Sequence, residues 1–102
     1  MIINGKEYKN VPITFNTFCK LEEMGVDLKS IESKLFSSAR AYAVLCMKKS
    51  AAAAGEEIEK HIINGGSIND IIEPFAKELE HSDFFQAMAK QATETSNEAA
   101  EE

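Results

Sequence analysis

The chain has 102 residues, of which 44% are hydrophobic and 27% are charged. This is the composition of one ordinary folded domain, and it argues against a disordered chain or a membrane chain. The 17 acidic residues outnumber the 11 Lys and Arg, the formal charge is −6, and Arg40 is the single arginine. Because phosphate binding needs a clustered basic face with several guanidinium groups, this composition argues against nucleic acid as a partner.

The sequence also argues against a membrane location. Its first residues show neither a basic front nor a long apolar run, so they do not have the pattern of a secretory signal. The apolar stretch Ala41–Met47 is far shorter than the ~20 residues that span a bilayer. We therefore expect a cytoplasmic protein with no membrane segment.

A β-hairpin is predicted at the N-terminus. Asn4-Gly5 is the pair that favours a two-residue type I′ turn, because both positions of that turn need a positive φ. The second strand is predicted over Lys6–Val11, and it must end at Pro12, which has no N–H to donate. Since a two-stranded ribbon is marginal in water, the hairpin is expected to pack on helices.

The first helix is predicted from its start signals. Thr14 is a good N-cap, with Asn16 as a rival two residues later. Ile13 before the cap and Phe18 four positions into the helix have the spacing of a hydrophobic staple.

The same helix has a clear stop signal. Gly25 lies where a left-handed residue is needed, and Val26 is placed to contact Leu21 in a Schellman closure. The predicted helix therefore covers Phe15–Met24.

Further helices follow in the middle of the chain. A short one is predicted from its cap Asp27, with Ser37-Ser38 as a break or a new cap. A central buried helix is predicted over Ala39–Ala53, apolar around most of its circumference, with Gly55 closing it. A short helix after Gly55 ends at the pair Gly65-Gly66.

The last helical region begins at Ser67, which is the predicted cap of the next helix. Pro74 is expected to kink or restart that helix, since its ring clashes with the preceding turn. Ser82 offers a fresh cap, and the apolar pattern ends by residue 92. The predicted fold is thus mainly α: a small helical domain over 1–92 of about five to six helices with a short N-terminal hairpin.

Residues 93–102 carry four glutamates and no apolar side chain larger than alanine. Such a segment cannot bury enough surface to offset the entropy of ordering, so an acidic disordered tail is predicted there. The predicted core of the folded part includes Phe18, Leu21, Leu45 and Leu79.

No catalytic or cofactor motif is present: the chain shows no nucleophile elbow, phosphate-binding glycine loop, zinc helix or calcium loop. Cys19 and Cys46 are far apart, and with His61 and His81 they lack the paired spacing of a zinc site. We interpret the thiols as small buried hydrophobes and the histidines as helix-surface residues. The prediction is a protein without enzymatic activity, cofactor or metal.

The candidate partner-binding residues are Phe84 and Phe85. Neighbours on a helix lie roughly 100° apart around its axis, so both rings reach the core only if the buried arc is wide. The alternative is that one ring anchors a partner helix, as aromatic side chains often do at interfaces. Both alternatives stay open at the level of sequence.

The order of these features resembles the tail assembly chaperones of long-tailed bacteriophages and prophages. The resemblance is carried by "INGKEYKNVPITFNTFCKLEEMGVDL", then "SSARAYAVLCMKKSA", then "INDIIEPFAKELEHSDFF" and an acidic polar end. It covers nearly the whole chain, although the motifs are patterns of turn, cap and aromatic pair, and Pro74 departs from the pattern.

The resemblance implies a non-catalytic protein of the bacterial host cytoplasm that keeps the helical tape measure protein soluble while tail tube subunits polymerise around it. It further implies a longer, frameshifted form that meets the tail tube protein. Self-association is a separate partner prediction. The alternative is a generic helical adaptor or regulatory interaction protein of a phage or mobile element. A small enzyme using a cysteine with a histidine is a third class, and it would need an electropositive niche for the thiol.

Overall fold

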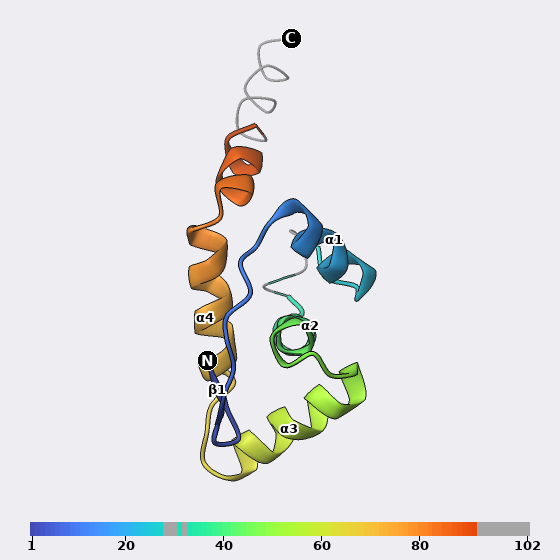
Figure 1. The fold of residues 1–102 in the computed structure, drawn as a ribbon, viewed down its shortest axis with the longest axis vertical. Coiled ribbons are helices and arrows are strands. Elements are labelled where there is room, and N and C mark those ends of the chain that lie inside the picture. Colours follow the sequence, from blue (N-terminus) through green and yellow to red (C-terminus); the bar gives the residue numbers. More distant parts are fainter. Residues whose placement is uncertain (28–30, 32, 92–102) are drawn as a thin grey trace.

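The computed structural model describes residues 1–27, 31 and 33–91. Within these residues the fold is mainly helical and carries a short antiparallel hairpin at its N-terminus, as predicted (Figure 1). The elements in chain order are β1 (Ile2–Ile3), β2 (Lys6–Glu7), α1 (Phe15–Glu23), α2 (Leu35–Met47), α3 (Ala51–Ile63) and α4 (Asn69–Glu80), and residues 83–91 are also helical. None of the helices in the described ranges has the length and apolar character needed to cross a bilayer.

The hairpin turn has the predicted geometry. Asn4 and Gly5 have φ values of 51° and 80°, which are the two positive values that a type I′ turn requires. Main-chain bonds between Met1 and Tyr8 extend the ribbon by one pair beyond β1 and β2. The second strand is shorter than the predicted Lys6–Val11, because the chain after Tyr8 leaves the ribbon and follows the helices.

Both ends of α1 are confirmed. The Thr14 hydroxyl accepts the Thr17 N–H at 3.2 Å, so Thr14 is the N-cap and Asn16 lies inside the helix. Gly25 has φ 89°, and the N–H groups of Gly25 and Val26 donate back to the last turn at 2.9 and 3.0 Å. This is the predicted Schellman closure, and the helix ends one residue earlier than expected.

The central helix is divided where the sequence did not suggest a division. The predicted helix Ala39–Ala53 is wrong: α2 ends before Lys48, which is left-handed with φ 57°, and the Ser50 hydroxyl caps α3. Gly55 lies inside α3, so the predicted helix end at this glycine is wrong. A Cβ on Gly55 would lie 3.5 Å from the Cδ of Arg40, which is an ordinary van der Waals distance, so the packing of α2 on α3 does not require a glycine here.

Two further expectations concern the first turn of α2 and the residues that precede this helix. Ser37 and Ser38 form neither a break nor a cap, because α2 already begins at Leu35. The Ser38 hydroxyl is buried and donates to the Ile31 carbonyl at 3.5 Å, which satisfies a polar group inside the core. The short helix predicted from Asp27 falls largely on 28–30 and 32, which lie outside the described residues, as does the predicted tail 93–102.

The turn between α3 and α4 follows the predicted glycine stop, but the predicted cap Ser67 lies one residue before the N-cap of α4, which is Ile68 and makes no side-chain cap bond. Gly65 is left-handed with φ 100°, the Ser67 hydroxyl accepts the Asn69 N–H at 3.1 Å, and the Asp70 carboxylate accepts the Ser67 N–H at 3.0 Å. The predicted restart at Pro74 is wrong, since α4 runs through it, and the break comes at the end of the helix. The buried stripe of α4 continues on both sides of the proline and holds the helix together.

The core consists of two clusters, one between α1, α2 and α4 and the other between β1, α2, α3 and α4. Tyr42 of α2 stacks on Phe75 of α4 with ring centroids 4.8 Å apart, and the Tyr42 hydroxyl donates to the Val11 carbonyl at 2.9 Å. Phe18, Leu21 and Leu79 are buried as predicted, whereas Leu45 is only partly buried at the edge of the core. The Val11 contact holds the chain that links the hairpin to α1 against α2.

Candidate partner-binding surface

Ser82 determines where the last helical segment lies. Its hydroxyl accepts the Phe85 N–H at 3.1 Å and donates to the Ile13 carbonyl, so it caps the segment 83–91 and also binds the residue next to the start of α1. Ser82 is buried, which keeps both contacts away from competing water. Segments far apart in the sequence are thereby held together at one end of the molecule (Figure 1).

Phe84 packs inward from this segment. Its ring centroid lies 5.4 Å from that of Phe15 in an edge-to-face arrangement, and 6.3 Å from that of Phe18. Phe18 is 7% exposed and belongs to the core. Phe84 therefore covers the core beside Phe18, and its own ring is half-buried.

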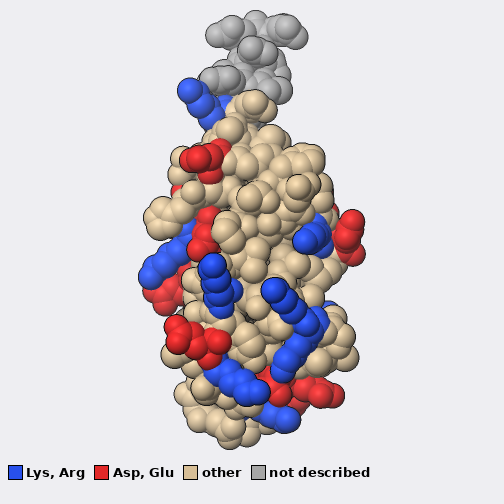
Figure 2. Space-filling view, viewed as in Figure 1, with Lys and Arg blue, Asp and Glu red and all other residues tan. Residues whose placement is uncertain are grey.

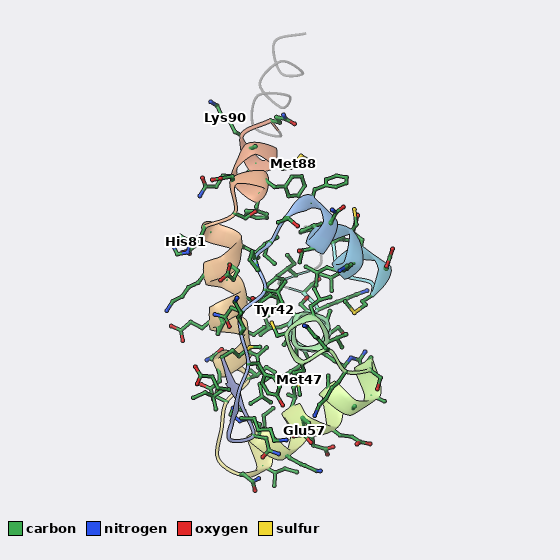
Figure 3. All side chains as sticks on the ribbon, viewed as in Figure 1. Tyr42, Met47, Glu57, His81, Met88 and Lys90 are labelled. Carbon is green, nitrogen blue, oxygen red and sulfur yellow. The ribbon has the colours of Figure 1, made fainter. Side chains whose placement is uncertain are left out.

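Phe85 is also half-buried and packs against the same core cluster as Phe84, but it forms none of the aromatic pairs found among the described residues. It borders a hollow of about 210 Å³ between α1 and the segment 83–91, which we call the aromatic hollow. Met88 lies on the α1 side of the segment (Figure 3). The hollow is lined by Phe15, Phe18, Cys19, Glu22, Phe84, Phe85 and Met88.

The surroundings of the aromatic hollow are apolar. Phe15 is 62% exposed although its neighbour in the helix, Phe18, is buried. Figure 2 shows that few Lys, Arg, Asp or Glu side chains lie on the visible face over this end of the molecule. An exposed apolar area with aromatic walls is typical of a surface that binds another protein.

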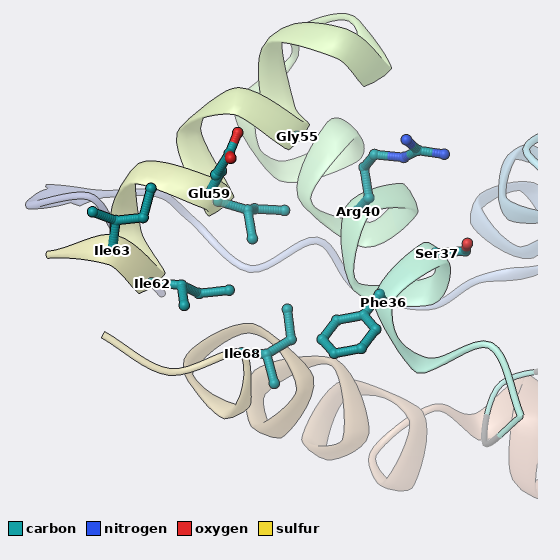
Figure 4. Close-up of a pocket in the computed structure, with 9 residues that line it drawn as sticks. Phe36, Ser37, Arg40, Gly55, Glu59, Ile62, Ile63 and Ile68 are labelled. Atoms are coloured by element: carbon teal, nitrogen blue, oxygen red, sulfur yellow. The ribbon is translucent and has the colours of Figure 1, made fainter. Parts of the chain in front are cut away.

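A second hollow of about 350 Å³ lies between α2, α3 and the start of α4, and we call it the isoleucine hollow. Phe36, Ile62 and Ile68 point toward one another across it, whereas Arg40 extends away from its centre (Figure 4). Phe36 is 70% exposed, so this ring projects largely into solvent. The lining residues are Phe36, Ser37, Arg40, Gly55, Ile58, Glu59, Ile62, Ile63 and Ile68.

The structure thus places both predicted residues, Phe84 and Phe85, at an apolar hollow, and it adds a hollow that the sequence reasoning missed. One signal for the second hollow was available, because Ile62, Ile63 and Ile68 stand on both sides of the glycine stop. Phe36 could not be assigned to the same place, since it comes from a helix that is distant in the sequence.

The residues considered for chemistry are not brought together. Cys46 is buried, and burial raises the pKa of its thiol, which disfavours a reactive thiolate. His81 is exposed as predicted, but the interpretation of His61 as a helix-surface residue is wrong, because its side chain is only 11% exposed and is bonded at both ring nitrogens. Among the described residues, no group of three or more His, Cys, Asp or Glu side chains could hold a metal ion.

No protein-family model, no curated protein and no solved structure matches this chain. The assignment of function therefore depends on the residues of the chain and on the resemblance that its sequence features carry.

Proposed function

We propose that this protein is a phage tail assembly chaperone, which binds helical segments of the tape measure protein and keeps that protein soluble without catalysing a reaction. The observation that supports the proposal best is the aromatic hollow, an apolar surface built on two helices that nothing in the described chain covers. Amphipathic helices bind other proteins in grooves of this kind. The link to the tape measure protein comes from the sequence resemblance.

The two rings differ in the role that we assign to them. Phe84 contacts the rings of Phe15 and Phe18, so its main contribution is to the fold. Both rings line the aromatic hollow, and we assign the anchor for the client helix to Phe85, because it forms no aromatic pair with the described core residues. Removal of a hot-spot aromatic costs about 2 kcal/mol or more of binding free energy, which corresponds to roughly 30-fold weaker binding.

The isoleucine hollow supplies a second contact for the same client. It lies between α2, α3 and the start of α4. Helix α3 lies at the opposite end of the molecule from the segment 83–91 (Figure 1). A long helical client offers several amphipathic segments, and two linked contacts bind more tightly than either one alone. In the proposed scheme a longer, frameshifted form of the chaperone carries the additional contact with the tail tube protein.

The test is co-expression of the chain with the tape measure protein of its own phage or prophage. Phe85→Ser should abolish co-purification while the helicity measured by circular dichroism stays unchanged, and Phe36→Ser should weaken it. Phe84→Ser should instead destabilise the fold. Ile2→Ser is the matched control, since Ile2 is 56% exposed and borders neither hollow, and it should leave co-purification unchanged.

The proposal is wrong if Phe85→Ser, correctly folded, co-purifies with the tape measure protein as well as the wild type does. Unfolding of both phenylalanine variants would restore the alternative in which both rings belong to a wide core. If the chain binds no tape measure protein and its gene does not precede a very long coiled-coil gene, a generic helical adaptor is the better description.

A further inference from the structure

His61 joins the hairpin to the helices. Its Nδ1 lies 2.9 Å from the backbone nitrogen of Asn4, in the hairpin turn, and its Nε2 lies 2.8 Å from the carboxylate Oδ2 of Asp70, at the start of α4. The ring itself belongs to α3. One side chain thus connects three elements of the fold.

The contact with Asn4 determines the protonation state of the ring. A backbone N–H can only donate, so Nδ1 must present its lone pair to Asn4. The ring proton is then on Nε2, where it is donated to Asp70. The neutral imidazole therefore satisfies both neighbours, and within the described part of the chain it is the acceptor that the Asn4 N–H has.

The ring has little space in which to change this arrangement. A Cβ on Gly66 would clash with the Nε2 of His61, so the loop after α3 packs closely against the ring. The side chain of His61 is 11% exposed.

We infer that His61 is a pH-sensitive latch, in which protonation of the imidazole releases the backbone of the hairpin turn while the contact with Asp70 persists. Protonation places a hydrogen on Nδ1, opposite the Asn4 N–H, so two donors face each other and the bond is lost. Histidine is the side chain whose charge ordinarily changes between pH 5 and 8.

Charged groups lie on each element packed against the ring. The hollow beside His61 is bordered by Glu7 of β2, by Asp70, Glu73 and Lys77 of α4, and by Met1 with its amino group, and Glu57 of α3 binds the Asn4 side chain.

The release is local. The Asn4 side chain still donates to Glu57 at 3.0 Å and accepts from Asn64 at 3.4 Å, so the turn stays near α3. The residue before the turn, Ile3, is fully buried against α3 and α4. When the turn backbone loosens, the end of β1 at Ile3 gains freedom to move. The helices do not need to separate for this to happen.

The experiment is a pH titration from 8 to 5 followed by nuclear magnetic resonance, with hydrogen exchange corrected for the intrinsic effect of pH. The Asn4 amide should shift together with the His61 ring signals, and its protection should fall about tenfold. The amide of Ala43, in the fully buried part of α2, should keep its protection. His61→Gln retains an acceptor that does not titrate and should remove the Asn4 transition, whereas His81→Gln should not.

The inference is overturned if the Asn4 amide stays unchanged while the His61 ring titrates, or if Asn4 and Ala43 lose protection together. It is likewise overturned if the Asn4 transition persists in His61→Gln. The measurement in the wild-type protein decides the question even where the glutamine variant does not fold. None of these outcomes depends on the tape measure protein.

Discussion

Replacing Phe18 by alanine should remove a large part of the stability of the fold. The side chain is 7% exposed, belongs to the same core cluster as Ile13 and Leu21, and has the Phe84 ring 6.3 Å away. A phenylalanine buries roughly 150–250 Å², which at ~25 cal/mol per Å² amounts to about 4–6 kcal/mol. Alanine keeps the Cβ, and measured core truncations of this kind cost ~3–5 kcal/mol.

The assay is urea denaturation followed by circular dichroism, with Phe15→Ala as the matched control. Phe15 is the same residue type in the same helix, but it is 62% exposed and has one ring contact with Phe84, so its loss should cost no more than ~1.5 kcal/mol. A cost below ~1 kcal/mol for Phe18→Ala, or equal costs for both variants, would refute the staple and the core placement.

Three further predictions concern stability. Tyr42→Phe should cost ~0.5–1.5 kcal/mol in denaturant, because it removes the hydrogen bond that the Tyr42 hydroxyl donates to the partly buried Val11 carbonyl. The pKa of Asp70 lies below its ordinary 3.8, chiefly because the Ser67 N–H binds the carboxylate, so its stabilising contribution is present above that pH and is lost as pH falls through the folded-state pKa. The melting temperatures of Asp70→Asn and the wild type should therefore differ at pH 7 and converge in acid. Deletion of 93–102 should move the melting temperature by less than about 4 °C, since the segment has no large apolar side chain.

Local signals in the sequence predicted the elements that depend on local chemistry. Asn4-Gly5 and Gly25 adopt left-handed conformations because the turn and the helix end require positive φ, and that requirement is readable from residue type. The division at Lys48 was missed, because lysine is rarely left-handed and the alanines on both sides favour a helix. Ser50 is a good N-cap residue and could have indicated the start of a new helix. The prediction instead followed the alanine-rich composition, which favours one continuous helix.

The candidate sites also differ in how far local sequence predicts them. Phe84 and Phe85 could be singled out because an aromatic doublet on a helix conflicts with a narrow buried face. The isoleucine hollow depends on Phe36 meeting residues that follow it by more than twenty positions, which only the packing of α2 against α3 produces. His61 was misassigned for the same reason, since its partners in the hairpin and α4 are unknown before the fold is known.

The most direct test of the proposed chaperone function is the soluble fraction of the tape measure protein, measured after expression alone and after co-expression with this chain. The proposal predicts that the tape measure protein aggregates when expressed alone, and that co-expression brings most of it into the supernatant in a complex that contains this chain. A tape measure protein that stays equally insoluble in the presence of the wild-type chain, or that becomes soluble without any complex, would contradict it.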